Sequence, residues 1–172
     1  WQAMGGMELG SIWGHGSYVA PDWTADWLHR ECEFILNHWS QQQYLQDYSA
    51  LSLEAQAALQ ARLTKLMRTN TFDPATNRLI IDPIRAEAYA SNRNYYSQLF
   101  SQGKESYSIP AGALTDQEKL SQLSAFFFWT SWAAATNRPG KDVTYTSNWP
   151  HEDLVANHPT PDAIVWTGVS II

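Results

Sequence analysis

Residues 6–24 have the sequence GMELGSIWGHGSYVAPDWT, and they are the most informative part of the chain. Residues 1–10 are predicted to form a short helix, which Gly10 ends because glycine suits the position just after a helix. Asp22 is predicted to cap a second helix, since its carboxylate accepts hydrogen bonds from the free N–H groups of a first helical turn. Large apolar residues recur at helical spacing from Trp23 to Trp39. The stretch therefore leads into a long amphipathic helix.

The rest of the chain is also mostly helical. The sequence predicts a helix over 52–69, a small β-hairpin over 69–81, a helix over 82–101 that begins at Asp82-Pro83, a very apolar helix over 115–135, and a proline-rich extended loop over 137–162. Thr115-Asp116-Gln117-Glu118 has the pattern of a capping box, in which the hydroxyl and the last carboxylate each satisfy a backbone N–H group. Since no repeat or low-complexity linker interrupts the pattern, it indicates one mainly α domain.

Composition excludes several classes of protein. The chain has 172 residues, of which 44% are hydrophobic and 16% charged, so it is globular. Its net charge is −6 and it has no run of Lys or Arg, which disfavours nucleic-acid binding. Cys32 is the one cysteine, which rules out an internal disulfide and a cysteine-rich metal site. The nine Trp, eight Tyr and six Phe favour a well-packed core, with an aromatic-lined binding groove as the alternative.

No common catalytic motif is present. The chain has no phosphate-binding glycine loop, no nucleotide-binding fingerprint, no Gly-x-Ser-x-Gly elbow and no His-Glu-x-x-His. His29 and His38 are nine residues apart and share a helix face poorly, and His151 lies in the proline-rich segment. Lone histidines of this kind are expected to be polar surface groups rather than ligands. Cys32 lies in an amphipathic helix and is interpreted as a core or boundary residue.

The last ten residues are apolar. The run from Ala163 to Ile172 carries no charge and is too short to span a bilayer by itself. On composition alone, a buried C-terminal helix or strand and the start of a membrane-spanning helix explain it equally well.

The segment from Gly14 to Pro21 resembles the haem-binding region of the cytochrome c subunit of bacterial nitric oxide reductases. In that family a Cys-x-x-Cys-His motif precedes a segment of the form Thr-Ile-x-Gly-Glu-Gly-Ala-Tyr-x-Ala-Pro. The resemblance implies that Gly6 and Leu9 stand in place of the two thioether cysteines and Gly10 in place of the axial histidine. The family's second axial ligand is a Met followed by Pro, and Ile109 occupies about that place. The implied fold is a cytochrome c-like helical core with inserted helices that has lost its haem c.

Longer motifs are similar to the N-terminal extracytoplasmic region of quinol-dependent nitric oxide reductases. These motifs are residues 1–31, 68–72, 126–132 and 148–152. This resemblance covers nearly the whole chain. It implies a haem-less cytochrome c-like domain over 1–136, a proline-rich extended segment over 137–162 and the start of a truncated transmembrane helix over 163–172.

The resemblance also implies a function. The parent enzyme, an inner-membrane oxidoreductase of denitrification and NO detoxification, converts two NO, two electrons and two protons into N2O and water, with quinol as the donor. Its haem b, catalytic haem b and non-haem iron lie in the membrane part. This chain would then be an inactive, cofactor-free structural cap on the periplasmic face, with the membrane-embedded catalytic part of the same polypeptide as its partner. A quinol- or partner-binding module with an aromatic face is the alternative.

Two further expectations follow from the resemblance. In the family, backbone oxygens near this segment help to hold Ca²⁺ between the cytochrome domain and the catalytic subunit, and Gly16 and Tyr18 match those positions. Two such ligands are too few for a site in the chain alone, so no metal is expected there. Bulky aromatic residues are expected to occupy the space of the lost haem: Trp13, Tyr18, Trp23, Phe126 and Trp129.

Overall fold

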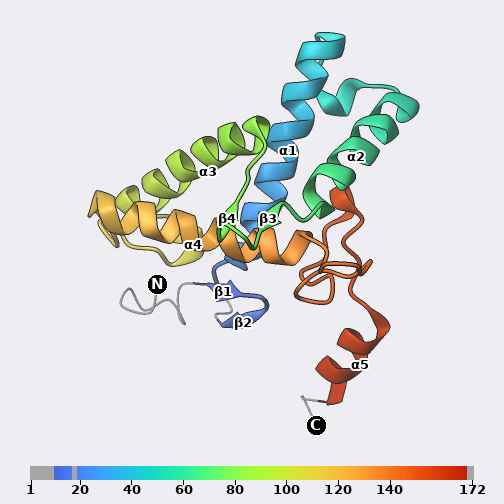
Figure 1. Cartoon of the computed structure of the whole chain (residues 1–172). Coiled ribbons are helices and arrows are strands. Elements are labelled where there is room, and N and C mark those ends of the chain that lie inside the picture. The colour runs from blue at the N-terminus through green and yellow to red at the C-terminus, as the bar shows by residue number, and fades with distance from the viewer. Residues whose placement is uncertain (1–9, 17–18, 170–172) are drawn as a thin grey trace.

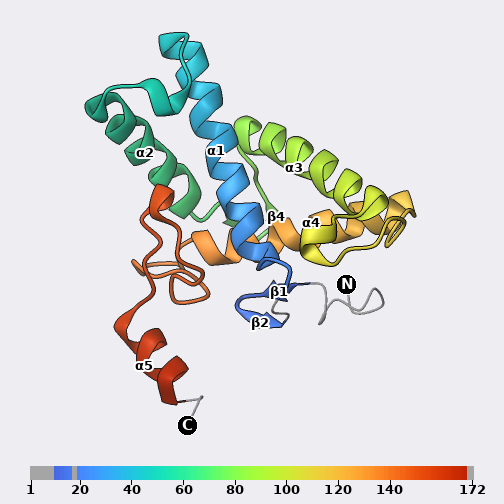
Figure 2. The same ribbon diagram turned by 180° about the vertical axis from the view of Figure 1, so that it is seen from behind.

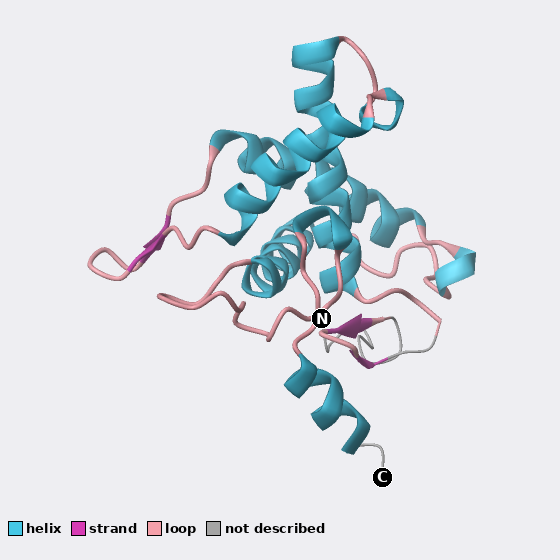
Figure 3. Cartoon of the chain, turned by 90° about the vertical axis from the view of Figure 1, so that its right-hand side faces the viewer, coloured by secondary structure: helices cyan, strands magenta, loops and turns pink. Residues whose placement is uncertain are grey.

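The computed structural model describes residues 10–16 and 19–169, and helices dominate this part of the chain (Figures 1 and 3). The α-helices are α1 (Trp23–Tyr44), α2 (Leu53–Arg68), α3 (Pro83–Gln102), α4 (Gln117–Ala135) and α5 (Pro161–Val169). Two antiparallel hairpins pair β1 (Ser11–Ile12) with β2 (His15–Gly16), and β3 (Phe72–Asp73) with β4 (Arg78–Leu79). Short 3-10 helices are η2 (Tyr48–Ala50), η3 (Glu105–Tyr107) and η4 (Asp153–Val155). The prediction of a mainly α fold is confirmed.

Helix α1 is the central element of the fold. In Figures 1 and 2 it runs between α2 and α3, and α4 crosses close to its N-terminal end. Its contacts with α2 are mainly aliphatic, and one buried cluster there includes Leu28, Ile35, Leu63 and Met67. Its N-terminal half instead meets α3 and α4 through a second, aromatic cluster. The core is thus divided along α1 into an aliphatic part and an aromatic part.

Local capping explains where most helices begin. Asp22 accepts a hydrogen bond from the backbone N–H of Ala25 at the start of α1 (3.0 Å), as predicted. Asp82 accepts one from Ile84 at the start of α3, with Pro83 in the first turn, also as predicted. The prediction of a capping box that begins at Thr115 is wrong. Because α4 begins only at Gln117, Asp116 is its N-cap residue and its carboxylate accepts from the N–H groups of Glu118 and Lys119.

The β1–β2 hairpin was not predicted. Its two turn residues, Trp13 and Gly14, both have positive φ (53° and 78°), as a two-residue turn of type I′ requires. Tryptophan is unfavourable in that conformation, and tertiary contacts offset the cost. The Trp13 indole N–H donates to the Thr130 carbonyl (3.2 Å) and its ring lies 5.5 Å from that of Trp129. The β3–β4 hairpin lies where the sequence predicted one. The helix predicted over residues 1–10 lies almost entirely outside the described residues.

Residues 136–160 return across the end of α2 and lead into α5. The guanidinium of Arg68 donates to the carbonyls of Val155 and Ala156 and to the side-chain oxygen of Asn137. Val155 is fully buried and belongs to the aliphatic cluster. This segment is therefore part of the folded body, whereas α5 extends away from the other helices (Figures 1 and 3).

Cys32 is fully buried in the aliphatic cluster, which confirms its interpretation as a core residue. Burial raises the pKa of its thiol well above the usual range, because the low-dielectric core disfavours the thiolate. A thiol in this state is a poor nucleophile and a poor metal ligand.

Candidate functional site: the aromatic cluster beside Gly10

Asp22 positions Gly10 against the start of α1. Besides capping the helix, one Asp22 carboxylate oxygen accepts hydrogen bonds from the Ser11 hydroxyl (2.8 Å) and the Gly14 N–H (2.6 Å). The backbone N–H of Ser11 also donates to the Pro21 carbonyl (3.2 Å). One side chain thus ties the β1–β2 hairpin to the helix that follows it. The sequence indicated only the capping role of Asp22, because the second role depends on the chain folding back.

Gly10 lies in direct contact with the Trp23 indole. A Cβ atom placed on Gly10 would lie 2.2 Å from Trp23 Nε1 and 2.8 Å from the Pro21 carbonyl oxygen. Both distances are well inside van der Waals contact, and the φ of Gly10 is +136°, where residues with a side chain are strained. Trp23 is fully buried among other aromatic rings, so a shift of its ring would displace those neighbours. Position 10 therefore accepts glycine and excludes a histidine side chain while Trp23 keeps this place.

Trp23 is surrounded by aromatic rings from three elements. Its ring stacks on Phe127 of α4 with centroids 5.7 Å apart, and meets Phe100 and Tyr96 of α3 at 5.5 and 6.0 Å. The ring centroid of Tyr107 in η3 lies 6.2 Å from that of Trp23. These separations are typical of close aromatic packing. The interior beside Gly10 is thus filled by the chain's own side chains.

The Tyr96 hydroxyl is the polar edge of this aromatic cluster. It donates to Asp26 Oδ2 (2.6 Å), and the same oxygen accepts from Arg30 Nε (2.8 Å). Burial, together with the neighbouring Asp26 carboxylate, raises the pKa of the Tyr96 phenol well above its usual range. Tyr96 therefore stays neutral and continues to donate this hydrogen bond at physiological pH.

The structure brings together two of the four predicted vestigial haem positions. Ile109 is 3% exposed and belongs to the same cluster as Trp23, so both Gly10 and Ile109 border the same aromatic interior. Reciprocal backbone hydrogen bonds with Lys104 (2.8 and 3.1 Å) hold the Ile109 backbone in place. Gly6 and Leu9 lie outside the described residues.

The aromatic residues expected to fill this space are only partly those that do so. Trp23 is at its centre and Phe126 packs on its border. Trp129 is 50% exposed, stacks on Phe126 and meets the Trp13 ring at a tilt. Tyr18 lies outside the described residues. Sequence reasoning missed Tyr96, Phe100, Tyr107 and Phe127, although Tyr96 and Phe100 have the i, i+4 spacing of one helix face.

The two expected calcium positions lie at or beyond the end of β2. Gly16 lies in β2, where it pairs with Ser11, and Tyr18 lies outside the described residues. The pairing places the Gly16 backbone on the short hairpin beside the aromatic cluster.

A family model matches residues 1–151 of this chain, and it describes the NorB cytochrome c-like domain of nitric oxide reductase. The chain belongs to this family. A comparison with curated proteins found no match. The family match extends over the aromatic cluster, α1–α4 and most of the loop before η4, so the cytochrome c-like domain comprises nearly all of the folded body.

Helix α5 follows the matched region. Its apolar side chains are exposed, with Ile164, Val165 and Trp166 at 62%, 61% and 70%. Within residues 10–16 and 19–169, no helix combines the length and the apolar character needed to cross a membrane.

Substituting Gly10 tests the close approach to Trp23. Gly10→Ala is expected to lower the free energy of unfolding by about 2–4 kcal/mol, combining backbone strain with a clash in a packed core. Gly112→Ala is the matched control, because Gly112 also has positive φ (+75°) but a Cβ there meets nothing within 4 Å. The control is expected to cost about 1–2 kcal/mol from backbone strain alone. Equal losses for the two variants in urea unfolding would contradict the contact.

Proposed function

We propose that this cytochrome c-like domain is a haem-free, non-catalytic structural cap on the extracytoplasmic face of the membrane-embedded part of a quinol-dependent nitric oxide reductase. The observation that carries the proposal is Trp23, which lies where a side chain on residue 10 would have to project. In the resemblance to cytochrome c subunits, residue 10 is the axial histidine position.

The donor chemistry of the chain does not fit haem c. Covalent attachment needs two cysteine thiols, and the iron needs donors such as imidazole and thioether. The matching positions are Gly6, Leu9, Gly10 and Ile109, which offer no thiol, imidazole or thioether. The one cysteine, Cys32, is buried in the other half of the core. Trp23 and its neighbouring rings fill the interior that Gly10 and Ile109 border, which further supports the haem-free assignment.

The lack of haem in this domain limits the routes by which electrons can reach the catalytic part of the parent enzyme. Without a redox centre here, electrons for the reduction of two NO to N2O have to enter through the membrane part, and quinol is the donor we propose. Haem b, the catalytic haem b and the non-haem iron belong to that part in our proposal. Ca²⁺ between the two parts would draw on backbone oxygens near Gly16 and Tyr18, with its remaining ligands supplied by the catalytic part.

Helix α5 supports the attachment to a membrane part. Its side chains Ile164, Val165, Trp166 and Val169 are exposed, and none of them belongs to the two buried clusters of the described residues. We propose that α5 begins a membrane-spanning helix, because exposed apolar side chains of this density are stable in lipid and unfavourable in water. The domain would then lie on the outer face of the inner membrane.

Haem content is the direct test of the proposal. The purified chain, coexpressed with haem-attachment machinery, is expected to show no covalent haem Soret band and no NO consumption when supplied with reduced quinol. A cytochrome c domain of known haem content, produced in the same cells, serves as the positive control for attachment. A covalently bound haem in this chain would overturn the proposal.

A quinol- or partner-binding module is the second candidate, and one exposed group of rings favours it. Trp129 is half-exposed between Phe126 and Trp13, with centroids 6.1 and 5.5 Å away. Titration of the chain with a soluble quinol, followed by tryptophan fluorescence in the wild type and in Trp129→Ala, distinguishes the candidates. Saturable quenching that Trp129→Ala abolishes would favour the binding module.

A further inference from the structure

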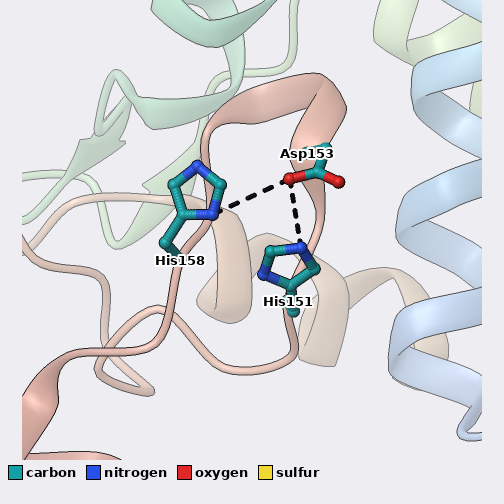
Figure 4. Close-up of side chains that lie close together, drawn as sticks. All are labelled: His151, Asp153 and His158. Atoms are coloured by element: carbon teal, nitrogen blue, oxygen red, sulfur yellow. Dashed lines mark ion pairs between the residues drawn. The ribbon is translucent and has the colours of Figure 1, made fainter.

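Three potential metal ligands meet on the loop before α5. His151 Nε2 lies 3.1 Å from Asp153 Oδ1, and His158 Nδ1 lies 3.8 Å from the same oxygen. The two imidazole rings have their centroids 5.0 Å apart. One donor atom from each residue falls within a group no more than 4.8 Å across. Figure 4 shows both imidazoles turned toward the Asp153 carboxylate.

We propose that His151, Asp153 and His158 form a binding site for a divalent transition metal ion, with Zn²⁺ as the best fit. Two imidazole nitrogens and one carboxylate oxygen are a common donor set for Zn²⁺ with an open position. Ligands at about 2.0–2.2 Å around a tetrahedral ion lie about 3.4 Å from one another. The separations of 3.1 and 3.8 Å from Asp153 Oδ1 lie on either side of this value, and rotations of the exposed side chains would bring the three donors onto one ion.

The backbone that carries these residues is held firmly. Glu152 and Asn157 exchange two backbone hydrogen bonds (3.0 and 2.9 Å), which close the turn between His151 and His158. The Asn157 side chain donates to the Pro150 carbonyl (2.6 Å), and the Asn148 side chain donates to the His158 carbonyl (3.0 Å). The loop therefore presents its three donors at nearly fixed spacing, which lowers the entropic cost of binding an ion.

The three donors are available to an ion from solvent. The neighbouring Glu152 is not one of these donors, because its carboxylate pairs with His29 (2.9 Å) and accepts from the Leu154 N–H (3.1 Å). The side chains of His151, His158 and Asp153 are 52%, 60% and 77% exposed, respectively. An ion can therefore reach them without any opening of the fold, and water would complete its coordination.

The position of the site suggests what the ion does. His158 lies three residues before α5 begins at Pro161, while Asp153 lies in η4, which also contains the buried Val155. A bound ion would therefore link the folded body to the segment that leads into α5. Since the ion binds the folded loop better than an unfolded one, it stabilises the native chain.

Zinc titration of the untagged 172-residue chain tests the site. Calorimetry is expected to give one Zn²⁺ per chain and a higher Tm with Zn²⁺ than without it. His151→Ala and His158→Ala are each expected to weaken binding at least about tenfold, because two remaining donors make a poor site. His38→Ala is the matched control, since His38 lies near Glu87 (3.8 Å) and outside this group of ligands, and it is expected to bind Zn²⁺ as the wild type does.

Cobalt provides a second, independent readout. Co²⁺ bound to the wild type is expected to give the intense visible bands of a low-coordinate site, which Zn²⁺ displaces and Asp153→Asn weakens. Circular dichroism of each variant checks that the fold persists, as expected for exposed side chains. The proposal is overturned if the wild type binds no stoichiometric Zn²⁺, or if His151→Ala and His158→Ala bind it as tightly as His38→Ala.

Discussion

Trp23→Ala is expected to lower the free energy of unfolding by about 3–5 kcal/mol, the usual range for removing a large aromatic side chain from a packed core. Trp23 is fully buried and touches the rings of Tyr96, Phe100, Tyr107 and Phe127, so its loss leaves a cavity at the point where α1, α3 and α4 meet. The neighbouring rings cannot close this cavity without leaving their own contacts. Chemical denaturation followed by far-UV circular dichroism measures the effect.

Trp129→Ala is the matched control for this variant. It removes the same side chain from a position that is 50% exposed, where the ring contacts only Trp13 and Phe126 among the aromatic residues described. The expected loss is about 2 kcal/mol, because only about half of the surface of this ring is buried. Similar losses for Trp23→Ala and Trp129→Ala would show that Trp23 is not the centre of the aromatic cluster.

Breaking the buried ion pair between α1 and α3 is expected to have a comparable effect. Arg85 Nε donates to Glu31 Oε1 (2.7 Å), and the two side chains are 5% and 0% exposed. Arg85→Ala leaves the Glu31 carboxylate buried without its partner, which typically costs about 3–5 kcal/mol. Urea unfolding at neutral pH measures the loss. The Arg30–Asp26 pair is more exposed, at 32% and 16%, and a smaller loss is expected for Arg30→Ala.

A double variant separates the cost of an orphaned charge from the value of the pair. Glu31→Leu combined with Arg85→Met replaces both charges with apolar side chains of similar size. This variant is expected to recover most of the stability that Arg85→Ala loses, because no charge remains buried. If it is as unstable as Arg85→Ala, packing around Arg85 rather than the unpaired carboxylate sets the cost.

The family match and the packing beside Gly10 concern the same part of the chain. The match over residues 1–151 assigns a cytochrome c-like domain, and the clash between a Cβ on Gly10 and Trp23 gives a steric reason why position 10 carries no side chain. The absence of a donor at position 10 is thus coupled to the packing of the core. Placing a histidine there would require changes at Trp23 as well, since two bulky groups cannot share this space.

Features that depend on neighbouring residues could be predicted without the structure. Asp22 and Asp82 cap their helices as predicted, because a carboxylate binds the N–H groups two or three residues further along the chain. The β3–β4 hairpin and the helical character of α1–α4 likewise follow from local turn chemistry and periodicity. Even here the exact start of α4 at Gln117 depended on competition between two adjacent capping residues, Thr115 and Asp116.

Contacts between distant residues became visible only in the folded chain. Trp13 adopts positive φ because Thr130 and Trp129 of α4 hold its indole, and Trp23 faces Gly10 because Asp22 folds the β1–β2 hairpin back onto α1. These contacts join segments whose spacing along the chain carries no periodic signal.

The proposed metal ligands show the same limit of sequence reasoning. Isolated in sequence, His151 had the pattern of a surface group, and His158 belonged to no motif. They come together with Asp153 because backbone hydrogen bonds between Glu152 and Asn157 close the turn between them. Arg68 of α2 also donates a hydrogen bond to the Ala156 carbonyl in this turn. Their meeting therefore arises from packing and hydrogen bonding across the fold, whereas helix caps and periodic faces arise from residues a few positions apart.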